Sequence, residues 1–85
     1  KMLPILTDVP CAYMNYGKKN QKALNKISVK DVKKLLNEGH FPEGSMGPKI
    51  EAAVEFAEAG GEAIITNFSS LREALRGKAG TTVMR

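Results

Sequence analysis

The run Ala-Ile-Ile-Thr at residues 63–66 is the feature that most restricts how this chain can fold. An uninterrupted apolar run of this kind is typical of a strand buried on both faces, in a sheet with helices on each side. Residues 48–59 precede it and carry apolar residues at i, i+3, i+4 and i+7: Ile50, Ala53, Val54 and Ala57. A second helix is predicted after the strand at residues 70–76, with Ser70 as its N-cap and Gly77 at its end.

The rest of the chain supplies the other predicted elements. A helix begins at Ser28, which resembles a capping residue with Asp31 three positions later, and ends at Gly39. Its apolar stripe consists of Val29, Val32, Leu35 and Leu36. Short strands are predicted at residues 3–7, 12–16 and 81–84, and a helical turn or two at residues 21–26. Helices between apolar strands indicate an α/β fold with a mainly parallel sheet.

Length and composition limit the classes of protein to consider. The chain has 85 residues, with 42% apolar and 26% charged, which is ordinary for one small globular domain. Its single cysteine, Cys11, excludes a disulfide within the chain, fits a reducing cytoplasm and is expected to be a small packing residue. No apolar run is long enough to cross a membrane, and no signal peptide is recognisable. The start at Lys1 rather than Met suggests a piece of a longer protein.

The net charge of +4 is mild. Its lysines are spread over residues 18–34 rather than forming a block, and few aromatic residues are present to stack on bases. Nucleic-acid binding is therefore not favoured, although a basic chain can attract phosphorylated ligands.

The segment from His40 to Ala53 is a loop that opens a helix, and it points to a phosphate site. Pro48 suits the first turn of a helix, where a missing N–H costs nothing. Lys49 follows in that turn, where the positive end of the helix dipole disfavours a cation. A lysine there is explained if it shares an anion with the free backbone N–H groups. The alternative is an ordinary surface lysine, since no Walker A motif is present.

Other residues allow a binding or a structural interpretation. Ligands of parallel sheets bind beyond the carboxyl ends of strands, where Asp8 follows the strand at 3–7. Asp8 could bind a ribose hydroxyl or a metal, or it could close a turn. Met46 could line an adenine or anchor the loop, and Tyr13 and Tyr16 could flank a base or pack in the core. The single histidine, His40, is not a zinc site.

Several segments, in their order, resemble the C-terminal part of the carbamate kinases, which belong to the amino acid kinase superfamily. They are Thr7-Asp8-Val9, Asn15-Tyr16-Gly17-Lys18 with Asn20-Gln21, Glu38-Gly39-His40-Phe41, Gly44-Ser45-Met46-Gly47-Pro48-Lys49, Ala63-Ile64-Ile65-Thr66 and Gly77-Lys78-Ala79-Gly80-Thr81. The resemblance covers nearly all 85 residues, and the Glu-Gly-His-Phe and Gly-Ser-Met-x-Pro-Lys motifs are specific to that family. Residues 67–69 depart from its pattern, as does Pro4.

The resemblance implies a three-layer α/β/α sandwich, of which residues 1–85 would be the C-terminal, nucleotide-binding part. It implies that Lys49 contacts the ATP phosphates as a catalytic residue, that Met46 lies at the adenine, and that Asp8, Val9 and Tyr13 line the nucleotide. ATP or ADP with Mg²⁺ would be the cofactors, and the chain itself would hold no metal site. The N-terminal half would bind carbamate or carbamoyl phosphate and contribute the phosphate loops.

By the same resemblance, the parent would be a cytoplasmic homodimeric enzyme, often acting in arginine fermentation, and the 85-residue piece would be inactive alone. Two alternatives remain open. One is a non-catalytic nucleotide-binding fragment, and the other is a small basic interaction module. Nucleic-acid binding would weaken steeply with salt, whereas adenine binding would compete with ADP.

Overall fold

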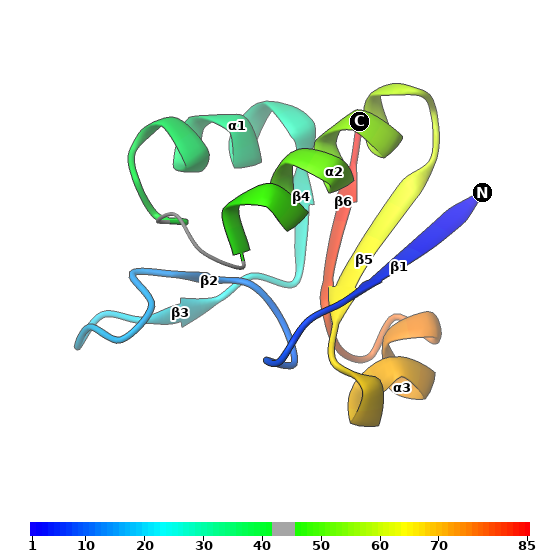
Figure 1. Ribbon diagram of the computed structural model, residues 1–85, viewed down its shortest axis with the longest axis horizontal. Coiled ribbons are helices and arrows are strands. Elements are labelled where there is room, and N and C mark those ends of the chain that lie inside the picture. The colour runs from blue at the N-terminus through cyan, green and yellow to red at the C-terminus, as the bar shows by residue number, and fades with distance from the viewer. Residues whose placement is uncertain (42–45) are drawn as a thin grey trace.

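The computed structural model describes residues 1–41 and 46–85. It contains the strands β1 (Met2–Leu6), β2 (Tyr13–Met14), β3 (Lys22–Ala23), β4 (Lys26–Ser28), β5 (Glu62–Thr66) and β6 (Thr81–Met84). Its helices are α1 (Val29–Asn37), α2 (Met46–Glu58), the short 3₁₀ helix η1 (Phe68–Ser70) and α3 (Leu71–Leu75). The predicted α/β class is therefore correct (Figure 1).

Four strands form the main sheet, in the order β1-β5-β6-β4. The pairs β1–β5 and β4–β6 are parallel, whereas β5–β6 is antiparallel, so the sheet is mixed but mainly parallel, as predicted. The strand β1 lies at one end of this order, which suits Pro4. The O of Lys1 and the N of Thr7 both bond to β5, so the missing N–H of Pro4 falls on the side away from β5.

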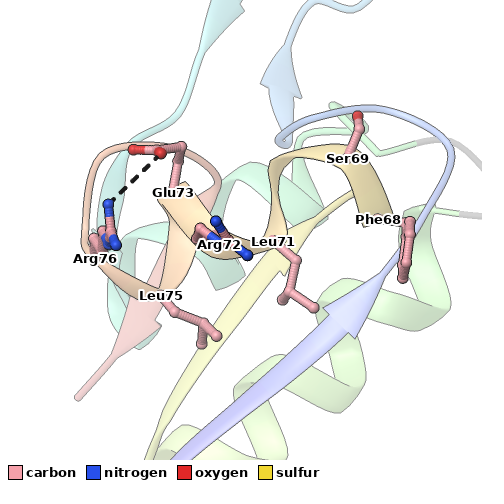
Figure 2. Close-up of a pocket in the computed structure, with 7 residues that line it drawn as sticks. All are labelled: Phe68, Ser69, Leu71, Arg72, Glu73, Leu75 and Arg76. Atoms are coloured by element: carbon pink, nitrogen blue, oxygen red, sulfur yellow. Dashed lines mark ion pairs between the residues drawn. The ribbon is translucent and has the colours of Figure 1, made fainter.

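Helices cover both faces of the sheet, as the three-layer prediction requires. In Figure 2, α3 lies in front of the sheet and α1 and α2 lie behind it. The helices α1 and α2 pack against each other and against the sheet, and they enclose the main core. The fully buried side chains of that core include Ile50, Val32, Ile65 and Val83. The strand β5 is buried at every position after Glu62, which confirms the prediction for residues 63–66.

The caps of α1 confirm the sequence prediction. The Oγ of Ser28 accepts a hydrogen bond of 3.1 Å from the backbone N of Asp31. At the other end Gly39 has φ +83°, a left-handed conformation that glycine adopts readily. The N of His40 then bonds to the O of Leu35, which closes the last turn.

Two local predictions were wrong, and a third was right in position but too long. Residues 21–26 form β3 and the start of β4 instead of a helical turn, because β3 pairs with β2 and β4 pairs with β6. The strand predicted at 12–16 shortens to β2, and it pairs in a separate two-stranded ribbon. The side chain of Ser70 makes no capping bond to α3; instead Asn67 caps η1 through its Oδ1, at 2.9 Å from the N of Ser70.

Candidate functional site

The carboxyl ends of the parallel strands β1 and β5 lie side by side, and we call this side of the sheet, where β1 and β5 end, the sheet edge. The N of Thr7 donates to the O of Thr66 at 2.8 Å and extends the pairing one residue past β1. Asp8 follows on the surface and accepts a 3.2 Å bond from the Thr7 hydroxyl, while Val9 is half-buried. The local bond supports a structural role for Asp8 in the turn, and its exposed carboxylate leaves one oxygen for a ligand.

The helix α2 begins at this same edge. Its last residue lies just before Gly60-Gly61, which lead into β5, so α2 must run back antiparallel to β5. Thirteen helical residues span about 20 Å, enough to reach from one edge of the sheet to the other. Met46, the first residue of α2, packs against the main core.

The first turn of α2 carries two of the predicted site residues. Met46 and Lys49 are both half-buried, and Met46 packs partly against the core. The helix starts at Met46 rather than at the predicted Pro48, so Pro48 is its third residue and still lies in the first turn. Backbone N–H groups of a first turn have no partner within the helix, so Lys49 and these donors present positive charge at one place. The rest of the proposed phosphate loop, residues 42–45, lies outside the described residues.

Two buried threonines fasten the segment that carries Asp8, Val9 and Tyr13 to the sheet edge. The Oγ1 of Thr66 donates to the O of Pro10 at 3.1 Å. The Oγ1 of Thr81 accepts from the N of Ala12 at 2.8 Å and donates to the O of Leu24. Both threonines are fully buried. Sequence reasoning missed them as site residues; the signal was a threonine at the last position of β5 and at the first position of β6.

The backbone next to Thr81 packs closely against β5 and α3. Gly80 has φ +78°, and a Cβ at this position would lie 2.9 Å from the O of Ile65 and 3.2 Å from the Cβ of Ala74. Real Cβ atoms do not approach backbone oxygens that closely. Gly80 therefore allows the turn into β6 to pass directly over β5.

The ribbon formed by β2 and β3 presents Tyr13 beside the edge. The rings of Tyr13 and Tyr16 lie 5.5 Å apart between centroids and are tilted by 36°. Hydrogen bonding with the Cys11 side chain and, to a lesser degree, burial raise the pKa of Tyr13 above 10.0. The phenol of Tyr13 has a ring face and a hydroxyl that a ligand could contact. Cys11 itself is buried, as predicted for a packing residue.

The predicted residues Asp8, Val9, Tyr13, Met46 and Lys49 lie on the turn after β1, on the β2–β3 ribbon and at the start of α2, which are all on the side of the molecule where β1 and β5 end (Figure 1). His40 lies apart, with its Nε2 3.5 Å from the Oε1 of Glu38. Among residues 1–41 and 46–85 there is no group of three or more His, Cys, Asp or Glu side chains that could hold a metal. Within those ranges, no helix is long and apolar enough to cross a bilayer.

A groove on the side of the sheet that α3 covers involves none of the predicted site residues (Figure 2). It lies along η1 and α3, as Figure 2 shows. Its lining residues are Phe68, Ser69, Leu71, Arg72, Glu73, Leu75 and Arg76. The groove and the predicted site residues are therefore separate parts of the molecule.

Comparisons with known proteins agree with the fold and with the resemblance of the sequence. Residues 1–67 match the model of the amino acid kinase family. Carbamate kinase from Thermococcus kodakarensis is 52% identical over 82 residues, which are 95% of this chain and 26% of that protein. Carbamate kinase from Giardia intestinalis is 45% identical over 84 residues, 98% of this chain and 26% of its own length. The chain thus spans little more than a quarter of the relatives that it matches.

Solved structures of carbamate kinase also match this chain. The carbamate kinase of Giardia lamblia bound to AMP-PNP superposes with a TM-score of 0.94 at 45% identity, over 99% of this chain and 30% of that one. A protein from Aeropyrum pernix superposes with a TM-score of 0.86 at 48% identity, over 98% of this chain and 27% of that one. Because the family model covers most of the chain and the fold agrees, the chain belongs to the amino acid kinase family.

Proposed function

We propose that this chain forms the nucleotide side of a carbamate kinase, which transfers a phosphoryl group between ATP and carbamate. The observation that supports this most strongly is the 0.94 superposition on a carbamate kinase bound to AMP-PNP, together with 52% identity to another carbamate kinase. Phosphoryl transfer depends mainly on positioning and on neutralising charge. A lysine at a helix start, beside free N–H donors, suits both tasks.

Each residue of the edge has a proposed role. Lys49 neutralises charge on the phosphates, and Met46 contacts the adenine. Asp8, Val9 and Tyr13 line the nucleotide. The donors at this edge fit a nucleotide phosphate chain, and Lys49 with the α2 N–H groups would hold it. Mg²⁺ would accompany the phosphates and supply further charge neutralisation.

The proposal extends to the parent protein. Carbamate or carbamoyl phosphate would be bound by the part of the fold that this chain does not contain. The parent would be a cytoplasmic homodimer, as the resemblance implies. The 85-residue chain alone should bind ADP at most weakly and should not form ATP from carbamoyl phosphate and ADP.

A chimera tests the assignment of Lys49. Residues 1–85 would replace the aligned segment of the Thermococcus kodakarensis carbamate kinase. Lys49→Ala should lower kcat about 10²–10³-fold, because a preorganised charge at the transferring group is lost. Lys49→Arg should not restore the rate fully, because the planar fork places its charge differently.

The matched control is Lys30→Ala. Lys30 is an exposed lysine in the first turn of α1, and α1 begins at the opposite edge of the sheet from α2. Its loss should leave kcat unchanged. A Lys49→Ala chimera with near-normal kcat would show that Lys49 is an ordinary surface lysine and would remove the catalytic assignment.

A further inference from the structure

Residues 11–24, which we call the ribbon segment, contain β2 and β3 and are held weakly by their own pairing. Two residue pairs join the strands, Tyr13 with Ala23 and Met14 with Lys22. Among the described residues, this ribbon is a sheet of its own and pairs with no strand of the main sheet. A two-stranded hairpin is at best marginally stable by itself. Contacts at its base must therefore set its position.

One side chain of the main sheet bonds to both legs of the ribbon at this base. The Oγ1 of Thr81 accepts a hydrogen bond of 2.8 Å from the N of Ala12 and donates one to the O of Leu24. The legs are also joined to each other, since the N of Leu24 donates to the O of Ala12 at 2.9 Å. Within residues 1–41 and 46–85, every hydrogen bond that leaves the ribbon segment goes to Thr81.

The bridge made by Thr81 is shielded from water. Thr81 and Ala12 are fully buried, and Leu24 packs against the main core. A hydrogen bond lost in such a place leaves a buried polar group without a partner, so the structure around it must shift or admit a water. Tyr13 follows Ala12 directly, and consecutive Cα atoms are about 3.8 Å apart, so a shift of Ala12 displaces Tyr13 as well.

We propose that Thr81 is a positioning residue for the nucleotide: its hydroxyl fixes Ala12, and through Ala12 the place of Tyr13, and so determines the affinity for ADP. The inference rests on the proposed function, which assigns Tyr13 to the nucleotide. Lys49 is carried by α2, and among the described residues no hydrogen bond joins α2 to the Thr81 hydroxyl. The bridge therefore affects nucleotide binding and leaves the phosphoryl-transfer step unchanged.

The chimera with the Thermococcus kodakarensis carbamate kinase tests this role. Thr81→Val should raise the Kd for ADP, measured by titration calorimetry, about three- to tenfold, which is what one aromatic contact contributes. The KM for ADP should rise by the same factor while kcat stays within about twofold, the pattern of lost uniform binding. Thr81→Ser keeps both hydrogen bonds and should restore the Kd of the parent chimera.

Val32→Ala is the control for lost stability. Val32 is fully buried on α1, and its truncation removes core packing without touching the bridge. This variant should lower the Tm of the chimera but leave the Kd and the KM for ADP at their parent values. An equal rise in the Kd of Val32→Ala would show that lost stability, and not the Thr81 hydroxyl, weakens binding.

Amide hydrogen exchange on the parent chimera tests the inference even if Thr81→Val fails to fold. Addition of ADP should slow exchange in residues 11–24 more than in α1. An unchanged Kd for Thr81→Val, no rescue by Thr81→Ser, or no added protection of residues 11–24 would each overturn the inference. A chimera that binds ADP with this dependence on Thr81 but forms no ATP from carbamoyl phosphate would support the inference and contradict the proposed function.

Discussion

Removing the hydroxyl of Thr81 should be among the most damaging conservative changes in this chain. Thr81→Val keeps the shape of the side chain, which is fully buried. It leaves the N–H of Ala12 and one bond of the Leu24 carbonyl without their partner. A buried polar group that loses its partner costs about 1–3 kcal/mol. Thr81→Val affects two such groups. If a water molecule replaces the lost partner of one of them, the free energy of unfolding should fall by about 3 kcal/mol.

That loss is large for so small a domain. At about 0.05–0.15 kcal/mol per residue, a chain of 85 residues has a free energy of unfolding of about 4–13 kcal/mol. The expected shift in Tm is about 12–24 °C, since each kcal/mol moves the midpoint of a domain of this size by about 4–8 °C. Urea denaturation followed by circular dichroism measures the change, and an unchanged m-value shows that the unfolding reaction is the same.

Two further variants separate the hydroxyl from the packing. Thr81→Ser keeps both hydrogen bonds and loses one methyl group, so it should cost only about 1 kcal/mol. Thr82→Val, at the half-buried next position of β6, should change stability little. Two results would contradict this role of the hydroxyl. One is a free energy of unfolding for Thr81→Val within about 0.5 kcal/mol of the parent value. The other is a loss of stability for Thr81→Ser as large as that for Thr81→Val.

Three other changes follow from the same geometry. Gly80→Ala should destabilise the chain by about 1–2 kcal/mol more than Gly77→Ala, because both residues have a positive φ but only Gly80 has atoms within 4 Å of the new Cβ; equal urea midpoints would contradict this. In the chimera, Met46→Ala should raise KM for ADP roughly tenfold with kcat unchanged, whereas unchanged ADP affinity with a lowered Tm would show that Met46 only anchors the helix. Because folding raises the pKa of Tyr13 above 10.0, the protonated Tyr13 contributes to stability below pH 10.0, and this contribution is lost as the pH rises above that value. Cys11→Ala should move the absorbance titration of Tyr13 back toward 10.0. An unmoved titration would remove Cys11 as the cause.

Local sequence patterns were sufficient where a helix or strand depends on its own residues. The capping bond of Ser28 and the left-handed Gly39 bound α1 as predicted, since both act within one turn of the helix. The continuous apolar run of β5 predicted burial on both faces, because apolar side chains are buried there without needing hydrogen-bond partners. The candidate residues on the turn, the ribbon and the start of α2 were also named from sequence, largely through resemblance to a family.

Tertiary contacts decided what these patterns could not. Residues 21–26 are polar enough to suit several conformations, and they became strands because β2 and β6 offered unpaired backbone partners. The antiparallel pairing of β5 with β6 depends on the glycine turn at residue 80 passing over β5, a contact between distant segments. The roles of Thr66 and Thr81 are invisible in sequence because their hydroxyls bond to backbone atoms more than 55 residues away. The sequence by itself thus determined the helices, the central strand and the candidate residues, while only the three-dimensional packing determined how the edge that carries them is held in place.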